Sequence, residues 1–182
     1  MKIKLIIVIS VVLLGVGAAF YDMGRVPDFV PVIEQVSNEN YKAAPDLPFS
    51  TMAGKEYTLY ELKQPVILLH YWASWCASCI VEFPDLLEMV AKGNGAIALV
   101  AISIDDDRSD LDRFMVKINK KSPQYVDNKN VYWVHDVDKS LSLKAFNIGR
   151  VPETIVVGSG NLMVDKLVGE TDWRSVLARY IK

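Results

Sequence analysis

Apolar runs and amphipathic stretches alternate through the middle of the chain. The runs 65–72 and 95–104 are almost wholly apolar and partly β-branched, which predicts two buried strands. Between them, apolar residues recur at helical spacing from residue 76 to a Lys-Gly-Asn-Gly turn, a pattern that predicts a helix. The segment 105–121 begins with aspartates and ends with lysines, the order that a helix dipole favours. The aspartates lack the spacing of a calcium-binding loop, so we interpret Asp105 to Asp107 as a solvated helix start.

The last third of the chain continues this alternation. The run 131–136 predicts a strand, and 139–146 predicts a short helix. Two further runs, 153–157 and 162–169, flank a Gly-Ser-Gly-Asn turn and predict a hairpin. A closing helix is expected over 171–181, with its first residue, a threonine, as N-cap. Alternating strands and helices, followed by a hairpin and a helix, predict an α/β fold in which a mixed sheet is covered on both faces.

The beginning of the chain has a different pattern. Lys2, Lys4 and the α-amino group precede an uncharged apolar run, residues 5–21. A basic start followed by an apolar run is typical of an export signal, and this run is at the short edge of what spans a bilayer. The small residues near its end make a poor cleavage site, which favours a signal anchor over a cleaved signal peptide within residues 1–21. With the lysines held inside, the rest of the chain is predicted to lie outside the cytoplasm.

Composition and charge agree with a single exported domain. The chain has 182 residues, of which 51% are hydrophobic and 23% charged, as expected for one compact domain with an appendage. The net charge of −2 gives no indication of a nucleic-acid partner. Residues 22–43 mix prolines and polar residues without a sustained period, which predicts a tether. The domain is therefore expected over 44–182.

The only two cysteines, Cys76 and Cys79, lie at the predicted strand-to-helix junction. A structural bridge across two residues would constrain the unfolded chain very little. A zinc site needs about four ligands, and the chain has only His70 and His135 and no second cysteine pair. A redox couple fits better, because a helix N-terminus lowers the pKa of the first thiol and the second lies close enough to attack a mixed disulfide.

Three motifs, in this order along the chain, resemble one protein family. They are "APDLPFSTMAGKEYTLYEL" (44–62), "WASWCASC" (72–79) with the following "VEFPDLLEM", and "HDVDKSLSLKAFNIGRVPET" (135–154). Together they are similar to the thioredoxin-fold TlpA/ResA/DsbE (CcmG) thiol-disulfide oxidoreductases, which are tethered to membranes outside the cytoplasm. The resemblance extends over about residues 44–182. It implies a thioredoxin-like fold with an N-terminal extension and an inserted helix within 105–133.

The resemblance also implies roles for individual residues. Cys76 would be the exposed nucleophile and Cys79 the resolving thiol of a redox-active disulfide. Val151 and Pro152 would form a cis-proline peptide that faces the disulfide and pairs with a substrate strand. Trp75 would shield the thiol and offer an apolar docking surface, although a tryptophan more often serves in packing alone. No cofactor or metal is implied.

Two acids and a histidine have both a functional and a plain structural interpretation. Glu82 lies one turn after Cys79; buried, it would have a raised pKa and could exchange protons with that thiol, but a solvated helix-face carboxylate is the usual alternative. Glu153 stands where relatives keep an acid beside the active site. His70 departs from the asparagine that this branch often has, and strand alternation directs it toward Cys79. A core histidine bonded to a backbone carbonyl is the interpretation that we slightly prefer.

The sequence leaves the direction of electron flow open, because Ser78 stands where many relatives have proline. The leading interpretation is an enzyme at the extracytoplasmic face of the bacterial inner membrane, or in the periplasm, that reduces disulfides of client proteins. By resemblance, apocytochrome c would be a client, in cytochrome c biogenesis, and an integral-membrane thiol protein would be the electron donor. The alternatives are a dithiol oxidase that introduces disulfides into folding proteins, and a non-catalytic binding or copper-handling module. Variants of either cysteine would separate them.

Overall fold

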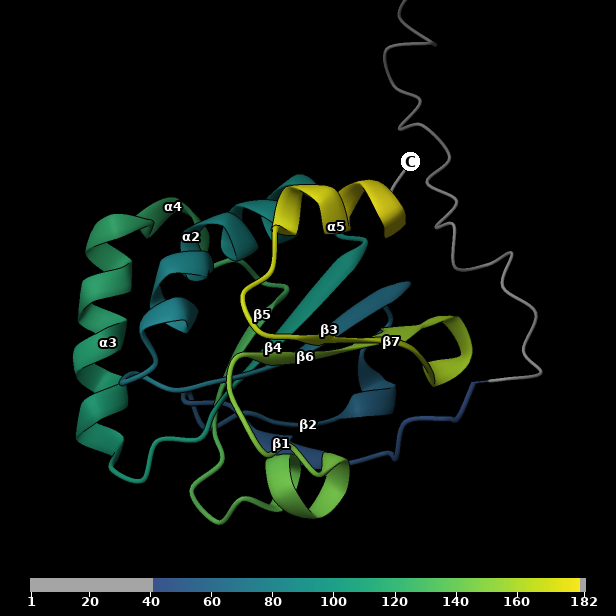
Figure 1. The fold of residues 1–182 in the computed structure, drawn as a ribbon, viewed down its shortest axis with the longest axis horizontal. Helices are drawn as coiled ribbons and strands as arrows, with labels where there is room; N and C mark the ends of the chain where they lie inside the picture. The colour runs from purple at the N-terminus through teal and green to yellow at the C-terminus, as the bar shows by residue number, and fades with distance from the viewer. Residues whose placement is uncertain (1–40, 181–182) are drawn as a thin grey trace, which may run out of the picture. The chain divides into compact units, whose positions relative to one another are not determined.

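A five-stranded sheet forms the centre of the computed structural model, which describes residues 41–180 (Figure 1). The strand order is β5-β4-β3-β6-β7; β3, β4 and β5 run parallel, and β6 and β7 are antiparallel to their neighbours. The bounds of the strands are Val66–Trp72 (β3), Ile97–Ser103 (β4), Val131–His135 (β5), Glu153–Gly158 (β6) and Leu162–Val168 (β7). The predicted α/β fold with a mixed sheet is therefore confirmed.

Helices cover one face of this sheet, and shorter elements cover the other (Figure 1). The helices of the first face are α2 (Ala77–Lys92), α3 (Arg108–Lys121), α4 (Pro123–Val126) and α5 (Trp173–Tyr180). The elements of the second face are a π-helical turn (Ser140–Lys144), the antiparallel pair β1 (Pro48–Ser50) and β2 (Glu56–Thr58), and a 3₁₀ turn (Leu59–Glu61). A second 3₁₀ turn, Ser159–Asn161, joins β6 to β7.

Side chains of β3 alternate between two hydrophobic cores because successive residues of a strand point to opposite faces. Leu68 and Trp72 pack with the helices, whereas Leu69 and Tyr71 pack with the extension and the π-helical turn. The Trp72 ring lies 4.3 Å from the Phe114 ring of α3, measured between centroids. Burying each such side chain contributes about 1.5–3 kcal/mol. The inserted helix α3 is thus part of the main core.

Two details of the predicted elements differ in the structure. Thr171 is not the N-cap of the last helix, because α5 begins later and the Asp172 carboxylate accepts the Arg174 N–H at 3.1 Å. The Thr171 N–H is instead bonded to Glu82. The predicted short helix over 139–146 is π-helical over Ser140–Lys144.

The chain before residue 41, with the predicted anchor and most of the predicted tether, lies outside the described residues. The last residues of the predicted tether lie against the domain, since the Lys42 carbonyl accepts the Met163 N–H at 2.9 Å. Within residues 41–180, no helix combines the length and the apolar character needed to cross a membrane.

Candidate active site

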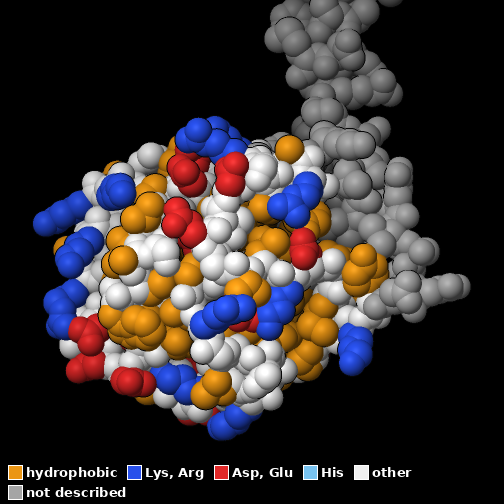
Figure 2. Space-filling view, in the orientation of Figure 1, with side chains coloured by type: hydrophobic (Ala, Val, Ile, Leu, Met, Phe, Trp, Pro, Cys, Tyr) orange, Lys and Arg blue, Asp and Glu red, His pale blue; other side chains and the backbone are white. Residues whose placement is uncertain are grey.

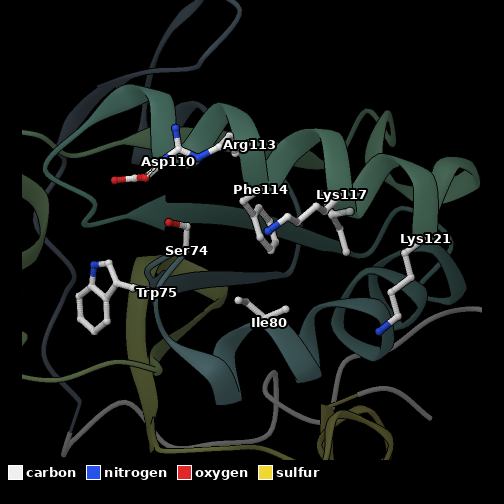
Figure 3. Close-up of a pocket in the computed structure, with 9 residues that line it drawn as sticks. Ser74, Trp75, Ile80, Asp110, Arg113, Phe114, Lys117 and Lys121 are labelled. Carbon is white, nitrogen blue, oxygen red and sulfur yellow. Dashed lines mark hydrogen bonds and ion pairs between the residues drawn. The ribbon is translucent and has the colours of Figure 1, made fainter.

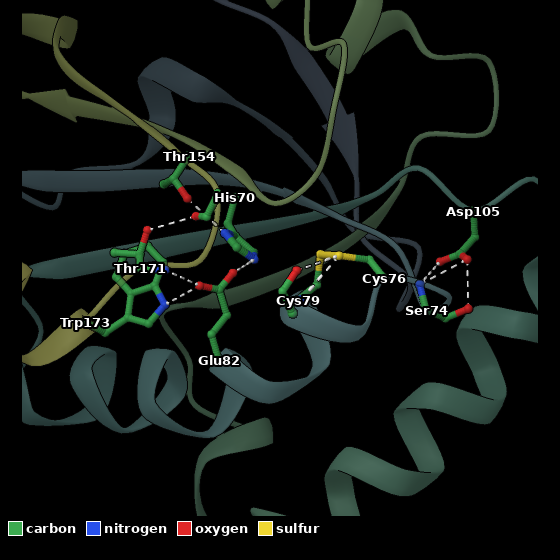
Figure 4. The surroundings of a disulfide bond; sticks show 11 residues. His70, Ser74, Cys76, Cys79, Glu82, Asp105, Thr154, Thr171 and Trp173 are labelled. Atoms are coloured by element: carbon green, nitrogen blue, oxygen red, sulfur yellow. Dashed lines mark hydrogen bonds and ion pairs between the residues drawn. A yellow bond between two sulfur atoms is a disulfide. The ribbon is translucent and has the colours of Figure 1, made fainter.

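Cys76 and Cys79 form a disulfide where β3 leads into α2 (Figure 4). Cys76 is the N-cap of α2, and its sulfur accepts the Cys79 N–H at 3.3 Å. The Ser78 hydroxyl lies 3.5 Å from the same sulfur. Cys76 keeps 7% of its surface exposed and Cys79 none. The unpaired N–H groups of a helix start favour a thiolate at Cys76, so the first cysteine is the one suited to nucleophilic attack.

The side of the disulfide next to Cys76 is open and apolar. Trp75 is 67% exposed, and Ile80 and Val81 also reach the surface. The Val151–Pro152 peptide bond is cis, which confirms the geometry implied by the resemblance. β6 begins at the residue after Pro152 and pairs with β3, the strand that leads to the cysteines. This arrangement presents an exposed aromatic side chain and an apolar rim beside the reactive sulfur.

The side of the disulfide next to Cys79 is closed to solvent. Glu82 lies on this closed side, one helical turn after Cys79, and is buried. Its Oε2 accepts the Thr171 N–H at 3.0 Å and the Trp173 Nε1–H at 3.2 Å (Figure 4). Burial raises the pKa of Glu82 to about 7, and these two hydrogen bonds oppose the rise. The interpretation as a solvated helix-face carboxylate is therefore wrong. A carboxyl group with such a pKa can both hold and release a proton near neutrality.

His70 is fully buried between the rings of Phe83 and Trp173. Its Nδ1 lies 2.9 Å from the Thr154 hydroxyl, and its Nε2 faces Glu82 Oε1 at 3.6 Å. The preferred interpretation of His70 as a core histidine is confirmed, but the expected backbone carbonyl partner is wrong, because both polar neighbours are side chains. Burial lowers the pKa of His70 to about 3, so the ring is neutral at physiological pH. Of these two groups, Glu82 is therefore the one that gains and loses a proton near neutrality.

Asp105 anchors the loop that precedes the nucleophile, a role that the sequence analysis missed. It is 1% exposed, and its carboxylate accepts the Ser74 N–H, the Ser74 hydroxyl at 2.8 Å and the Ser103 hydroxyl at 2.6 Å. The interpretation as a solvated helix start holds for Asp107, which caps α3, but is wrong for Asp105. The signal that could have revealed it is its place at the carboxyl end of a strand parallel to β3, since such ends meet at one edge of a sheet.

Glu153 lies on the opposite face of the sheet from Glu82. Its neighbour across the β3–β6 ladder is Tyr71, which packs in the second core, whereas Thr154 pairs with His70. Glu153 is buried and forms an ion pair with Lys166. The structure thus gathers Cys76, Cys79, Glu82 and His70 on one side and separates Glu153 from them. Within residues 41–180, no group of three or more His, Cys, Asp or Glu side chains is arranged to hold a metal.

Comparisons with known proteins agree with this geometry. A family model described as thioredoxin-like matches residues 64–163. The thiol:disulfide interchange protein DsbE of Pseudomonas fluorescens biotype C is 30% identical over 141 residues, covering 75% of this chain and 72% of that protein. The thiol-disulfide oxidoreductase ResA of Bacillus cereus is 22% identical over 130 residues, covering 71% of this chain and 69% of that protein. StoA from Bacillus subtilis shares the fold, with a TM-score of 0.59 and 16% identity over 74% of this chain and 96% of StoA.

The family model covers more than half of the chain, including the cysteine pair, the cis-proline and most of the sheet. The DsbE relative matches 75% of this chain at 30% identity, which establishes kinship. With its disulfide at a helix N-terminus, the chain belongs to the thioredoxin-like family, among the thiol-disulfide oxidoreductases of the ResA and DsbE type.

Proposed function

We propose that this protein is tethered to a membrane and reduces disulfides of proteins outside the cytoplasm. The observation that carries the proposal is the asymmetry of the Cys76–Cys79 pair. One sulfur lies at a helix N-terminus beside an exposed tryptophan, and the other is buried on the side of Glu82. Reduction of a client needs one sulfur that the client can reach and a second that acts only on the bound intermediate.

In the first step, the thiolate of reduced Cys76 attacks one sulfur of the client disulfide. The helix N-terminus, the Cys79 N–H and the Ser78 hydroxyl stabilise this thiolate. The client S–S bond breaks, a bond between Cys76 and the client forms, and the other client sulfur leaves as a thiolate. Trp75 would lie against the client, and the backbone of Val151 and Pro152 would pair with the client strand.

In the second step, the Cys79 thiol gives its proton to ionised Glu82, which lies on the same side of α2. The Cys79 thiolate then attacks the Cys76 sulfur and expels the client as a second thiolate. The client gains two electrons, and the Cys76–Cys79 disulfide forms. Glu82 returns the proton to the leaving thiolate or to solvent. The Thr171 N–H and the Trp173 Nε1–H hold the Glu82 carboxyl in place through Oε2, and His70 Nε2 faces the other oxygen, Oε1, at 3.6 Å.

The direction of electron flow is supported by the surroundings of Cys76. A strongly oxidising pair needs a strongly stabilised thiolate. Here the donors to the Cys76 sulfur are one backbone N–H and one neutral hydroxyl, and within residues 41–180 no charged group is hydrogen-bonded to it. Such an environment favours the disulfide form of the enzyme, and therefore a reductant.

The proposed cellular location and the proposed partners are inferred from the sequence. Residues 5–21 would anchor the chain so that the domain works at the extracytoplasmic face of a bacterial inner membrane, in the periplasm. Clients would be disulfide-bearing proteins, apocytochrome c among them, as in cytochrome c biogenesis. An integral-membrane thiol protein would return the enzyme to its dithiol form after each turnover.

The deciding measurement is the reduction potential of Cys76–Cys79 in the full chain, by titration with dithiothreitol and glutathione and alkylation of free thiols. We expect a value near that of thioredoxin, about −270 mV. A value near −120 mV would assign the opposite direction, oxidation of client dithiols. Failure to form the disulfide at all would contradict the exchange mechanism itself.

A further inference from the structure

A groove of about 360 Å³ runs from the active-site loop along α3 (Figure 3). Ser74 and Trp75 lie at one end, next to the nucleophile, and Ile80 belongs to the first turns of α2. The other wall is α3, from which Phe114 and Lys117 extend toward Ile80 in the close-up. The proposed mechanism uses Trp75 from this groove but none of its α3 residues, although the groove opens directly beside Cys76.

The floor of the groove is apolar. It includes Trp75 and Ile80, which are 67% and 38% exposed, and the more deeply placed Phe114 and Ile118. Exposed apolar side chains that gather beside a reactive group are typical of a binding site for another molecule. Bound apolar side chains of a partner would remove this surface from water.

The rim of the groove is positively charged, although the chain as a whole carries −2. Arg113, Lys117 and Lys121 lie on successive turns of α3, and lysine and arginine side chains gather over this helix in the space-filling view (Figure 2). Arg113 is neutralised by Asp110. Within residues 41–180, neither Lys117 nor Lys121 has a carboxylate within ion-pair distance. Two lysines thus remain available to a negatively charged partner.

We propose that this groove binds the client segment next to the attacked disulfide, and that the segment is extended and carries acidic side chains at alternate positions. The inference rests on the proposed function, because the groove adjoins the sulfur to which the client becomes bonded. Lys117 and Lys121 are separated along the helix axis by about 6 Å. Alternate residues of an extended chain are about 6.5 Å apart, so acids at positions i and i+2 match the two lysines.

The test uses the reduced full chain and three disulfides. Two are peptides of matched sequence, with either aspartate or lysine at alternate positions on both sides of the cysteine; the third is the small, uncharged hydroxyethyl disulfide. At low ionic strength we expect the acidic peptide to be reduced about tenfold faster than the basic one, and salt to diminish the ratio. Lys117→Glu and Lys121→Glu should each lower the ratio about threefold or more, without changing the rate with hydroxyethyl disulfide.

The matched control is Lys120→Glu, which makes the same charge change on an exposed position of α3 that does not line the groove. It should keep the peptide ratio within about twofold of the parent. If Lys120→Glu lowered the peptide ratio as much as the groove variants do, the preference would arise from the overall electrostatic field of the protein. That result would overturn the proposal that the groove binds the client.

Two further outcomes separate the proposals. If hydroxyethyl disulfide is reduced but the peptide ratio is near one, only the proposal that the groove binds the client is overturned. If no disulfide is reduced, the proposed function is overturned. A parent dimer, detected by sedimentation, that Lys121→Glu dissociates would assign the groove to a second copy of the chain instead of a client.

Discussion

The two sulfurs of the disulfide have opposite surroundings. On the Cys76 side are a helix N-terminus, an exposed tryptophan and a groove with a cationic rim. On the Cys79 side are a buried carboxyl group and a buried imidazole, enclosed by aromatic rings. The open side is suited to selecting and attacking a client, and the closed side to moving a proton between groups that are buried from bulk water.

Helical periodicity produces this difference from a short segment. Glu82 and Phe83 lie three and four residues after Cys79, and all three point into the core, whereas Ile80 and Val81 point outward. The comparison teaches that position on the helix, more than residue type, assigns the two cysteines their separate tasks.

The strongest test of the comparison is to remove each sulfur in turn. Cys76→Ala should lower disulfide exchange by about three orders of magnitude, because the client loses the only nucleophile that it can reach. Cys79→Ala should retain the first attack and accumulate mixed disulfides between Cys76 and the client. Non-reducing electrophoresis with mass spectrometry distinguishes the two variants. Equal trapping by both would mean that the sulfurs are interchangeable.

A smaller effect is expected when the closed side loses its titrating carboxyl group. In the parent, the resolution of a preformed mixed disulfide should quicken as pH rises through about 7, the pKa of Glu82, since the ionised form accepts the Cys79 proton. Glu82→Gln should remove this inflection and slow resolution about tenfold or more at pH 8. Stopped-flow measurement between pH 5 and 9 records both quantities.

Glu153→Gln is the matched control, because Glu153 is also a buried glutamate but faces the other core and pairs with Lys166. Its pH profile should follow that of the parent. A Glu82→Gln profile that also follows the parent would exclude proton transfer through Glu82.

In the parent, the smallest expected effect concerns stability, because two opposing contributions cancel. Burial raises the pKa of Glu82 from 4.5 to about 7, so its contribution to stability is complete below pH 4.5 and is lost as pH rises through 7. Burial lowers the pKa of His70 from 6.5 to about 3, so its contribution is complete above pH 6.5 and is lost as pH falls toward 3. Between pH 4.5 and 6.5 the two slopes, each about 1.4 kcal/mol per pH unit, have opposite signs and cancel.

Single variants should expose these slopes in urea unfolding at a series of pH values with the disulfide intact. Relative to the parent, Glu82→Gln should gain stability as pH rises from 4.5 to 6.5, and His70→Asn should lose it. The same slope in both variants would refute independent burial of the two groups.

The elements predicted from sequence were those whose signal is local. Long apolar runs identified β3 and β4, and the spacing of the cysteines identified the redox pair, because neither requires knowledge of distant contacts. The N-cap of α5 was predicted one residue too early, at Thr171, since Thr171 and Asp172 are both good capping residues. Which of them caps α5 depends on Glu82, whose carboxylate takes the Thr171 N–H.

The environment of the proton-transfer groups could not be predicted in the same way. The partner of His70 is 84 residues away in the chain, and the donors to Glu82 are 89 and 91 residues away. The His70–Thr154 contact depends on the antiparallel register of β3 and β6, and the Glu82 contacts depend on how α5 packs on α2. Local patterns carry no information on either. Asp105, 31 residues from Ser74, could be placed near the cysteines only through its position at the end of the neighbouring parallel strand.

The Asp105 carboxylate has a consequence for the timescale on which the active-site loop opens. Loops that precede helices are normally among the first segments to exchange their amide hydrogens with solvent. The Ser74 amide, however, is bonded to a carboxylate that is itself buried and held by the Ser103 hydroxyl. Its hydrogen should therefore exchange as slowly as those of the central strands, and cleavage of the neighbouring disulfide should leave that protection intact. The nucleophile would then approach each client from a loop as rigid as the sheet.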